Sequence, residues 1–101
     1  MDTIFEWNPD KAEKNLRKHR LSFETAIRAF ADPLALVEQD RFENGEHRWQ
    51  TLGMVEGYLL VLVAHTVRDD EDGTEVIHII SARRADQNER KRYEQNCSLW
   101  T

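Results

Sequence analysis

The stretch YLLVLVAHTVRDDEDGTEVIHIISARR, residues 58–84, decides the fold of this 101-residue chain. Its apolar start, from Tyr58 to Ala64, is typical of a central strand covered on both faces. The acidic segment 68–73 then indicates a hairpin loop, and the β-branched residues that follow indicate a strand returning beside the first. This second strand ends in two adjacent arginines, Arg83 and Arg84.

The segments before this hairpin carry clear boundary signals. Asn8 is placed to cap a first helix that begins at Pro9, and Ser22 is placed to cap a second helix that ends before Pro33. The ENG triplet at 43–45 indicates a turn. Further strands are expected at residues 3–7, 34–39 and 46–54.

A last helix is expected from about Asp86, which has capping-box spacing to Glu89. The inward faces would carry Ala12, Leu16 and His19 or Arg20 on the first helix, and Tyr93, Cys97 and Trp100 on the last. The order β-α-α-β-β-β-β-α predicts a single α+β domain over residues 1–101, with an antiparallel sheet packed by helices.

Composition narrows the class of protein. The longest apolar run is about a third of the ~20 residues that cross a bilayer, and the N-terminus has no basic start, so neither membrane insertion nor export is expected. A single cysteine, Cys97, cannot form an internal disulfide. We therefore expect a cytoplasmic protein.

The charges are unevenly distributed along the chain. The formal net charge is −5, yet residues 11–20 and 83–92 each hold five Lys or Arg against one and two acids, respectively. The acids gather at 38–46 and 69–75. A weakly acidic chain can therefore still present a basic face to a nucleic acid.

Three histidines on successive strands, His47, His65 and His78, raise the possibility of a metal site. Their spacing matches no zinc motif, and packing or solvent exposure is the ordinary alternative. The glycines are isolated turn residues, so a phosphate loop is not indicated either. We expect neither a metal nor another cofactor.

Arginine placement is the stronger signal. Arg83 ends its strand and Arg84 lies in the connection to a helix N-terminus, where guanidinium groups and helix N–H groups would both suit a phosphate. The alternative is that each arginine pairs with Asp86 or Glu89. An antiparallel meander could also bring Arg48 and His65 beside Arg83, supplying the base, acid and positive charge that metal-free RNA cleavage needs.

Several motifs in order resemble the BrnT toxin family: FEW followed by K-x-x-N-x-x-K-H, then S-F-x-x-A, D-P, E-x-R with L-G, and I-S-A-R-x-A with E-R and Y. The resemblance implies a bacterial type II toxin with a RelE-like fold, an endoribonuclease that inhibits translation. It also implies neutralisation by a BrnA-like antitoxin. DNA would be bound only through the antitoxin complex, which represses its own promoter.

Chemistry and resemblance together give two sets of candidate residues. The catalytic candidates are Arg83, Arg48, His65 and His19. The RNA-binding candidates are Lys14, Lys18, Arg84 and His78. Two positions depart from the family pattern: Arg20 stands where glycine is usual after K-H, and His78 replaces an arginine, which exchanges a fixed charge for a group that titrates near pH 6.5.

Two other classes of function stay open. One is a non-catalytic half of an autorepressing complex, with the acidic surface and the C-terminal SLWT, residues 98–101, as partner-binding features. The other is a domain that binds single-stranded RNA through basic and aromatic side chains, Trp7 and Trp49 among them, without cutting it.

Overall fold

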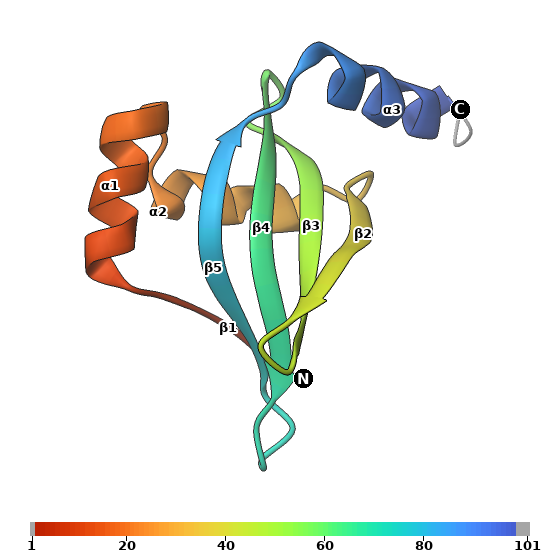
Figure 1. Ribbon diagram of the computed structural model, residues 1–101. Helices are drawn as coiled ribbons and strands as arrows, with labels where there is room; N and C mark the ends of the chain where they lie inside the picture. The colour runs from red at the N-terminus through yellow and green to blue at the C-terminus, as the bar shows by residue number, and fades with distance from the viewer. Residues whose placement is uncertain (1, 99–101) are drawn as a thin grey trace.

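The structure, a computed structural model, describes residues 2–98 (Figure 1). In chain order its elements are β1 (Thr3–Trp7), α1 (Pro9–His19), α2 (Phe23–Ala26), the 3-10 helix η1 (Ile27–Ala31), β2 (Leu36–Glu43), β3 (Glu46–Val55), β4 (Leu59–Asp69), β5 (Glu75–Arg84) and α3 (Gln87–Ser98). This order confirms the predicted α+β class. No helix among the described residues is long and apolar enough to cross a membrane.

The five strands form one mixed sheet in the order β1-β5-β4-β3-β2. Strands β2 to β5 are the predicted antiparallel meander. Strand β1 instead lies parallel to β5, with Thr3 opposite Glu75 and Trp7 opposite Ile79. The sheet is therefore not wholly antiparallel, because the long connection from β1 through β4 allows a parallel pairing that no short turn could make.

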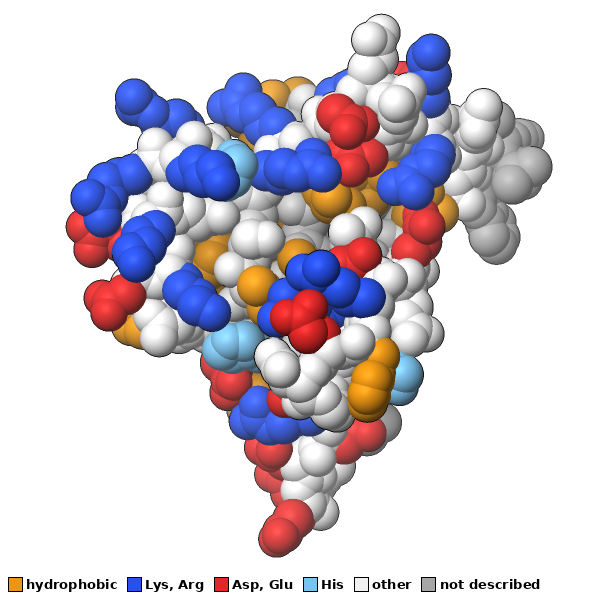
Figure 2. Space-filling model, viewed as in Figure 1, with side chains coloured by type: hydrophobic (Ala, Val, Ile, Leu, Met, Phe, Trp, Pro, Cys, Tyr) orange, Lys and Arg blue, Asp and Glu red, His pale blue; other side chains and the backbone are white. Residues whose placement is uncertain are grey.

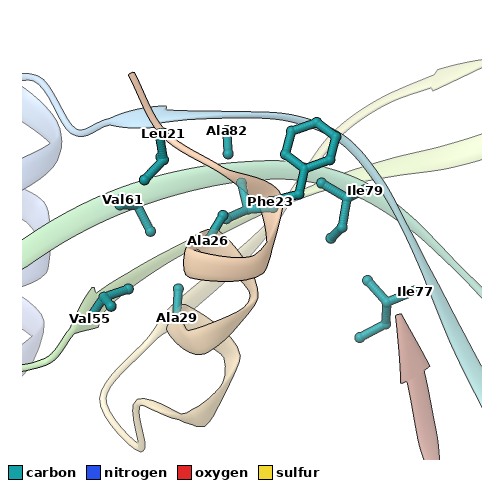
Figure 3. Close-up of a cluster of buried hydrophobic side chains, with 10 residues drawn as sticks. Leu21, Phe23, Ala26, Ala29, Val55, Val61, Ile77, Ile79 and Ala82 are labelled. Atoms are coloured by element: carbon teal, nitrogen blue, oxygen red, sulfur yellow. The ribbon is translucent and has the colours of Figure 1, made fainter. Parts of the chain in front are cut away.

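Helices cover the two faces of the sheet unequally. The segment α2–η1 runs across one face, behind the sheet in Figure 1, whereas α3 lies over the upper end of the other face. Figure 3 shows Phe23, Ala26 and Ala29 pointing from α2 and η1 toward side chains of the sheet. A smaller cluster around Leu62 and Tyr93 packs α3. No helix of residues 2–98 covers the lower part of the face that carries α3 (Figure 1).

Local sequence signals predicted two helix starts and the turn between β2 and β3 correctly, whereas the strand expected at 34–39 runs from Leu36 to Glu43. The Asn8 side chain accepts hydrogen bonds from the backbone N–H groups of Asp10 and Lys11, as an N-cap should. Asn44 and Gly45 both have positive φ, as the turn between β2 and β3 requires. The capping box of α3 is also confirmed, since Asp86 and Glu89 each accept a bond from the other's backbone N–H.

The predicted inward face of α1 is confirmed at Ala12 and His19, which are half-buried, and wrong at Leu16. Leu16 is 47% exposed, and Asn15 is the buried residue of this helix. The Asn15 amide donates to the carbonyls of Leu21 and Ala82 at 3.0 and 2.8 Å and accepts from the Ala82 N–H at 3.1 Å. Because β1 pairs with β5 only as far as Ile79, this side chain satisfies the strand edge beyond it.

A second connection, partly buried, joins η1, β3 and α3. The Asp32 carboxylate accepts hydrogen bonds from the backbone N–H groups of Leu34 and Met54 and from the Tyr93 hydroxyl. Partial burial acts to raise the pKa of Asp32, but these three donors together hold it below its ordinary value. Trp100, predicted beside Tyr93, lies outside the described residues.

One close approach fixes η1 on the sheet. A Cβ built on Gly53 of β3 would lie 2.5 Å from the backbone oxygen of Ala29, well inside van der Waals contact. Only glycine therefore allows this distance. The second half of the predicted second helix is also wound more tightly than an α-helix, as η1.

We expect Asn15→Ala to lower the free energy of unfolding by about 2–4 kcal/mol, because it leaves the backbone groups of Ala82 and Leu21 buried without partners. Urea unfolding measures the change. Glu13→Ala, on the exposed side of the same helix, is the matched control and should change stability little. Equal stabilities of Asn15→Ala and wild type would contradict the role given to this amide.

Candidate functional site: a basic open face of the sheet

The sheet face that carries α3 has a strongly polar border. Figure 2 shows Lys and Arg side chains gathered over α1 and along the upper rim, whereas Asp and Glu dominate the lower tip, where β4 turns into β5. The basic segment of α1 and the acidic loop at 70–74 thus lie at opposite ends of the molecule. A chain of net charge −5 in this way presents a basic surface to an anionic partner.

The cations of this surface divide into paired and unpaired groups. Among residues 2–98, no acid lies within ion-pair distance of Lys14, Lys18, Arg20 or Arg84, and all four are exposed. Arg20 ends α1 with a φ of 56°, the left-handed conformation in which glycine is usual. The unpaired cations supply positive charge that the protein itself does not neutralise.

Arg83 belongs to the paired group. Its two Nη atoms donate to the two carboxylate oxygens of Glu89 at 2.8 and 2.9 Å, a bidentate fork. The Glu89 hydrogen bonds raise the pKa of Arg83, and the same bonds lower the pKa of Glu89. Of the two readings of Arg83 from sequence, pairing with an acid is thus the one that the structure contains. A phosphate at Arg83 would have to displace Glu89.

Arg48 lies in a different part of the sheet from Arg83. Arg83 is opposite Leu62 and, through it, Leu52, whereas Arg48 lies four residues along β3 from Leu52, roughly 13 Å at the rise of a strand. Arg48 pairs with Glu43 at 3.6 Å. The expectation that the meander brings these two arginines together is therefore wrong.

His65 is a core residue. It faces α2–η1 on the side of the sheet away from α3, is 2% exposed, and packs its ring edge-on against Phe30 at 5.0 Å. Its Nε2 lies 2.8 Å from the Thr51 hydroxyl, and its Nδ1 has no partner among the described residues. Burial lowers its pKa to about 4, so the ring is neutral at pH 7. The catalytic role predicted for His65 does not fit this position.

His78 lies on the opposite, open side of the sheet and has a charged partner. Its Nδ1 is 2.9 Å from a carboxylate oxygen of Glu6 on the neighbouring strand β1. Arg68 of β4 holds the same carboxylate with two hydrogen bonds of 3.0 and 3.2 Å. Bonds from Arg68 first, and from His78 second, lower the pKa of Glu6. The three side chains form a connected acid–base cluster.

The remaining histidines lie apart from one another. His19 is half-buried in the last turn of α1, and His47 is hydrogen-bonded to Gln39 at 2.7 Å. His47 and His78 line one hollow, but His65 is buried on the other side of the sheet, so the three histidines do not converge on one site. Within the described part of the chain, no group of three His, Cys, Asp or Glu side chains is arranged to hold a metal ion.

Comparison with known proteins decides the family. The family model described as "Ribonuclease toxin, BrnT, of type II toxin-antitoxin system" matches residues 7–89. The chain belongs to the BrnT toxin family. Its fold is similar to the crystal structure of the Brucella abortus ribonuclease toxin BrnT, with a TM-score of 0.64 and 22% identity over 86% of this chain and 100% of that chain. No curated protein matches the chain.

Several residues of the family motifs have roles in this structure that were not predicted from the sequence. Two side chains that organise the open face, Glu6 and Arg68, were not among the predicted site residues, although Glu6 is the acid of the FEW motif. Asn15, the N of K-x-x-N, is structural rather than exposed to a substrate. A charged residue inside an apolar strand segment, as Glu6 is between Phe5 and Trp7, was the available signal.

We expect the stability of this BrnT family member to fall as the pH is lowered from 6.5 to about 4. The pKa of His65 is lower in the folded chain than in the unfolded chain, so in this range only the unfolded chain binds the proton. Proton binding therefore lowers the free energy of unfolding by about 3 kcal/mol in total. Urea unfolding at pH 7, 5 and 4 measures the loss. His65→Gln should lack this component, whereas His47→Gln should retain it; equal pH dependence of both variants would count against a buried neutral His65.

Proposed function

We propose that this chain is a metal-independent endoribonuclease that acts in the cytoplasm, inhibits translation, and is neutralised by a BrnA-like antitoxin. The observation that carries the proposal is the set of unpaired cations, Lys14, Lys18 and Arg84, on the basic surface of a BrnT family fold. Lys and Arg side chains without acid partners are free to contact a phosphate backbone. Contact with DNA would be made by the antitoxin in the complex.

The candidate roles follow from position. Lys14 and Lys18 on α1, with Arg84 at the end of β5, would hold RNA phosphates, and half-buried His19 lies in the same last turn of α1 as Lys18. Arg83 and Arg48 would stabilise the charge of the pentacoordinate phosphate only after exchanging Glu89 and Glu43 for it. We leave His65 out of this site because of its burial.

A second candidate function is favoured by the same ion pairs. Arg83 is already engaged by a bidentate carboxylate, and Arg48 by Glu43, so both predicted phosphate ligands are neutralised within the chain. Such a surface fits a protein that does not cut RNA and that binds either RNA or only an antitoxin. Catalytic and binding functions make different predictions for Glu89.

The function is tested by incubating the purified chain with RNA in excess chelator and following cleavage. We expect cleavage by wild type and its loss in Arg83→Ala. The informative partner is Glu89→Gln, which keeps an acceptor for the α3 cap but removes the negative charge that holds Arg83. If Arg83 contacts the phosphate, Glu89→Gln should keep or raise activity. RNA that is bound but stays intact with wild type would support the second candidate.

RNA binding is tested separately through its salt dependence. Lys14→Ala and Lys18→Ala should each reduce the slope of log affinity against log salt by about 1, because each removes one phosphate contact. Arg28→Ala is the matched control: it also removes one positive charge, but from η1, where Arg28 pairs with Glu56. Equal slopes for all three variants would argue against a site on α1.

A further inference from the structure

The open face of the sheet contains a hollow toward its lower end, where the β2–β3 turn borders β4, β5 and β1. Its lining includes Glu6, Thr66, Arg68 and His78, together with half-buried Trp49. Glu6, His78 and Thr66 are direct neighbours across three strands, since His78 is opposite both of the others. On β3, Arg48 lies one position beyond Trp49, the partner of His65, and is therefore next to Thr66 of β4.

The hydrogen bonds determine which nitrogen of His78 carries the proton. The pKa of Glu6 is lowered, so its carboxylate is ionised at neutral pH and can only accept a hydrogen bond. Nδ1 of His78, 2.9 Å from this carboxylate, must therefore be the N–H nitrogen. In the neutral ring the lone pair then lies on Nε2. Among the described residues, no hydrogen bond engages this Nε2.

The exposure of the cluster suits a reaction on a bound substrate. The side chain of His78 is 35% exposed and that of Glu6 40%, whereas His65 is 2% exposed. Arg68 restricts the Glu6 carboxylate through two bonds, so the acid that orients the imidazole is itself held in place. A carboxylate that fixes the tautomer and direction of a histidine is the usual support for a general base.

We propose that His78 is a general base of this ribonuclease, with Glu6 as the residue that positions it and Arg68 as the residue that positions Glu6. This inference rests on the proposed function, because it assigns a proton-transfer group to that RNA-cleaving face. His78 was expected from sequence only to bind RNA. Its hydrogen bond to Glu6 assigns it a chemical role that an arginine at this position would not have.

The step conserves atoms and charge. Nε2 of His78 takes the proton of a ribose 2′-hydroxyl, and the 2′-oxygen forms a bond to the adjacent phosphorus. The bond from phosphorus to the 5′-oxygen breaks, and the proton returns through solvent from the imidazolium to this oxygen. The products are a 2′,3′-cyclic phosphate and a 5′-hydroxyl end. Arg48, next to Thr66 in the same row, is a candidate to stabilise the phosphorane after exchanging Glu43 for the phosphate.

A general base acts only in its unprotonated form, so we expect cleavage to weaken at low pH. The titratable and charged side chains that line the hollow with His78 are Glu6 from β1, Arg68 from β4, and Glu46 and His47 from β3, and Arg48 lies in the same row of the sheet. Glu6 is the one in contact with it. The acid limb of the rate should therefore depend on Glu6 as well as on His78.

The test measures cleavage of a short RNA in chelator between pH 5 and 8, for wild type, His78→Gln, His78→Arg and Glu6→Gln. We expect His78→Gln to lose activity about 100-fold and to lose the acid limb. His78→Arg should bind RNA at least as well as wild type but remain slow, and Glu6→Gln should shift the acid limb. Glu56→Gln, which alters an exposed pair with Arg28, should match wild type.

A second measurement does not depend on activity. Nitrogen NMR of His78 should show the proton on Nδ1 in wild type and a mixture of tautomers in Glu6→Gln; a proton on Nε2 in wild type would overturn the inference. Cleavage by His78→Gln at the wild-type rate and pH profile would overturn it while the ribonuclease function stands. If wild type itself leaves RNA intact, the proposed function fails, and this inference fails with it.

Discussion

The fold depends on one side-chain amide that takes the place of a missing strand. β1 pairs with β5 only as far as Ile79, so the outer edge of β5 beyond that residue has free backbone groups. Asn15 supplies a donor and an acceptor to Ala82 and a second donor bond to Leu21, and it thereby ties α1 to the strand that ends in Arg83. The basic helix and the basic strand end are held side by side by this bond set.

The second face is organised by a carboxylate rather than an amide. Asp32 joins the end of η1 to β3 and α3, and α3 in turn carries Glu89, the partner of Arg83. Asn15 thus ties α1 to the strand that ends in Arg83, and Asp32 ties η1 and β3 to the helix that carries Glu89. Arg83 is therefore paired with an acid only in the assembled tertiary structure, because Glu89 lies within reach only when α3 is docked.

Sequence predicted what depends on neighbours along the chain. The cap at Asn8, the turn at Asn44–Gly45 and the Asp86–Glu89 box involve residues at most three positions apart, and all three are present. The errors concern contacts across the fold: the parallel pairing of β1, the burial of Asn15 instead of Leu16, and the separation of Arg48 from Arg83. His65 and His78 lie on opposite faces because His78 pairs with Thr66, the neighbour of His65, and successive residues of a strand face opposite sides. The sequence did not supply this register.

The contact between Gly53 and Ala29 has a consequence for the genetics of the chain. Every missense change at a glycine codon introduces a Cβ, and at position 53 that atom would overlap a backbone oxygen, which cannot move aside as a flexible side chain could. A substitution at this position can therefore inactivate the protein by disrupting its fold, although the position does not contact the basic face. In a chain whose activity harms its host, survivors of a mutational screen would include such fold-breaking alleles, and their positions alone would not outline the site.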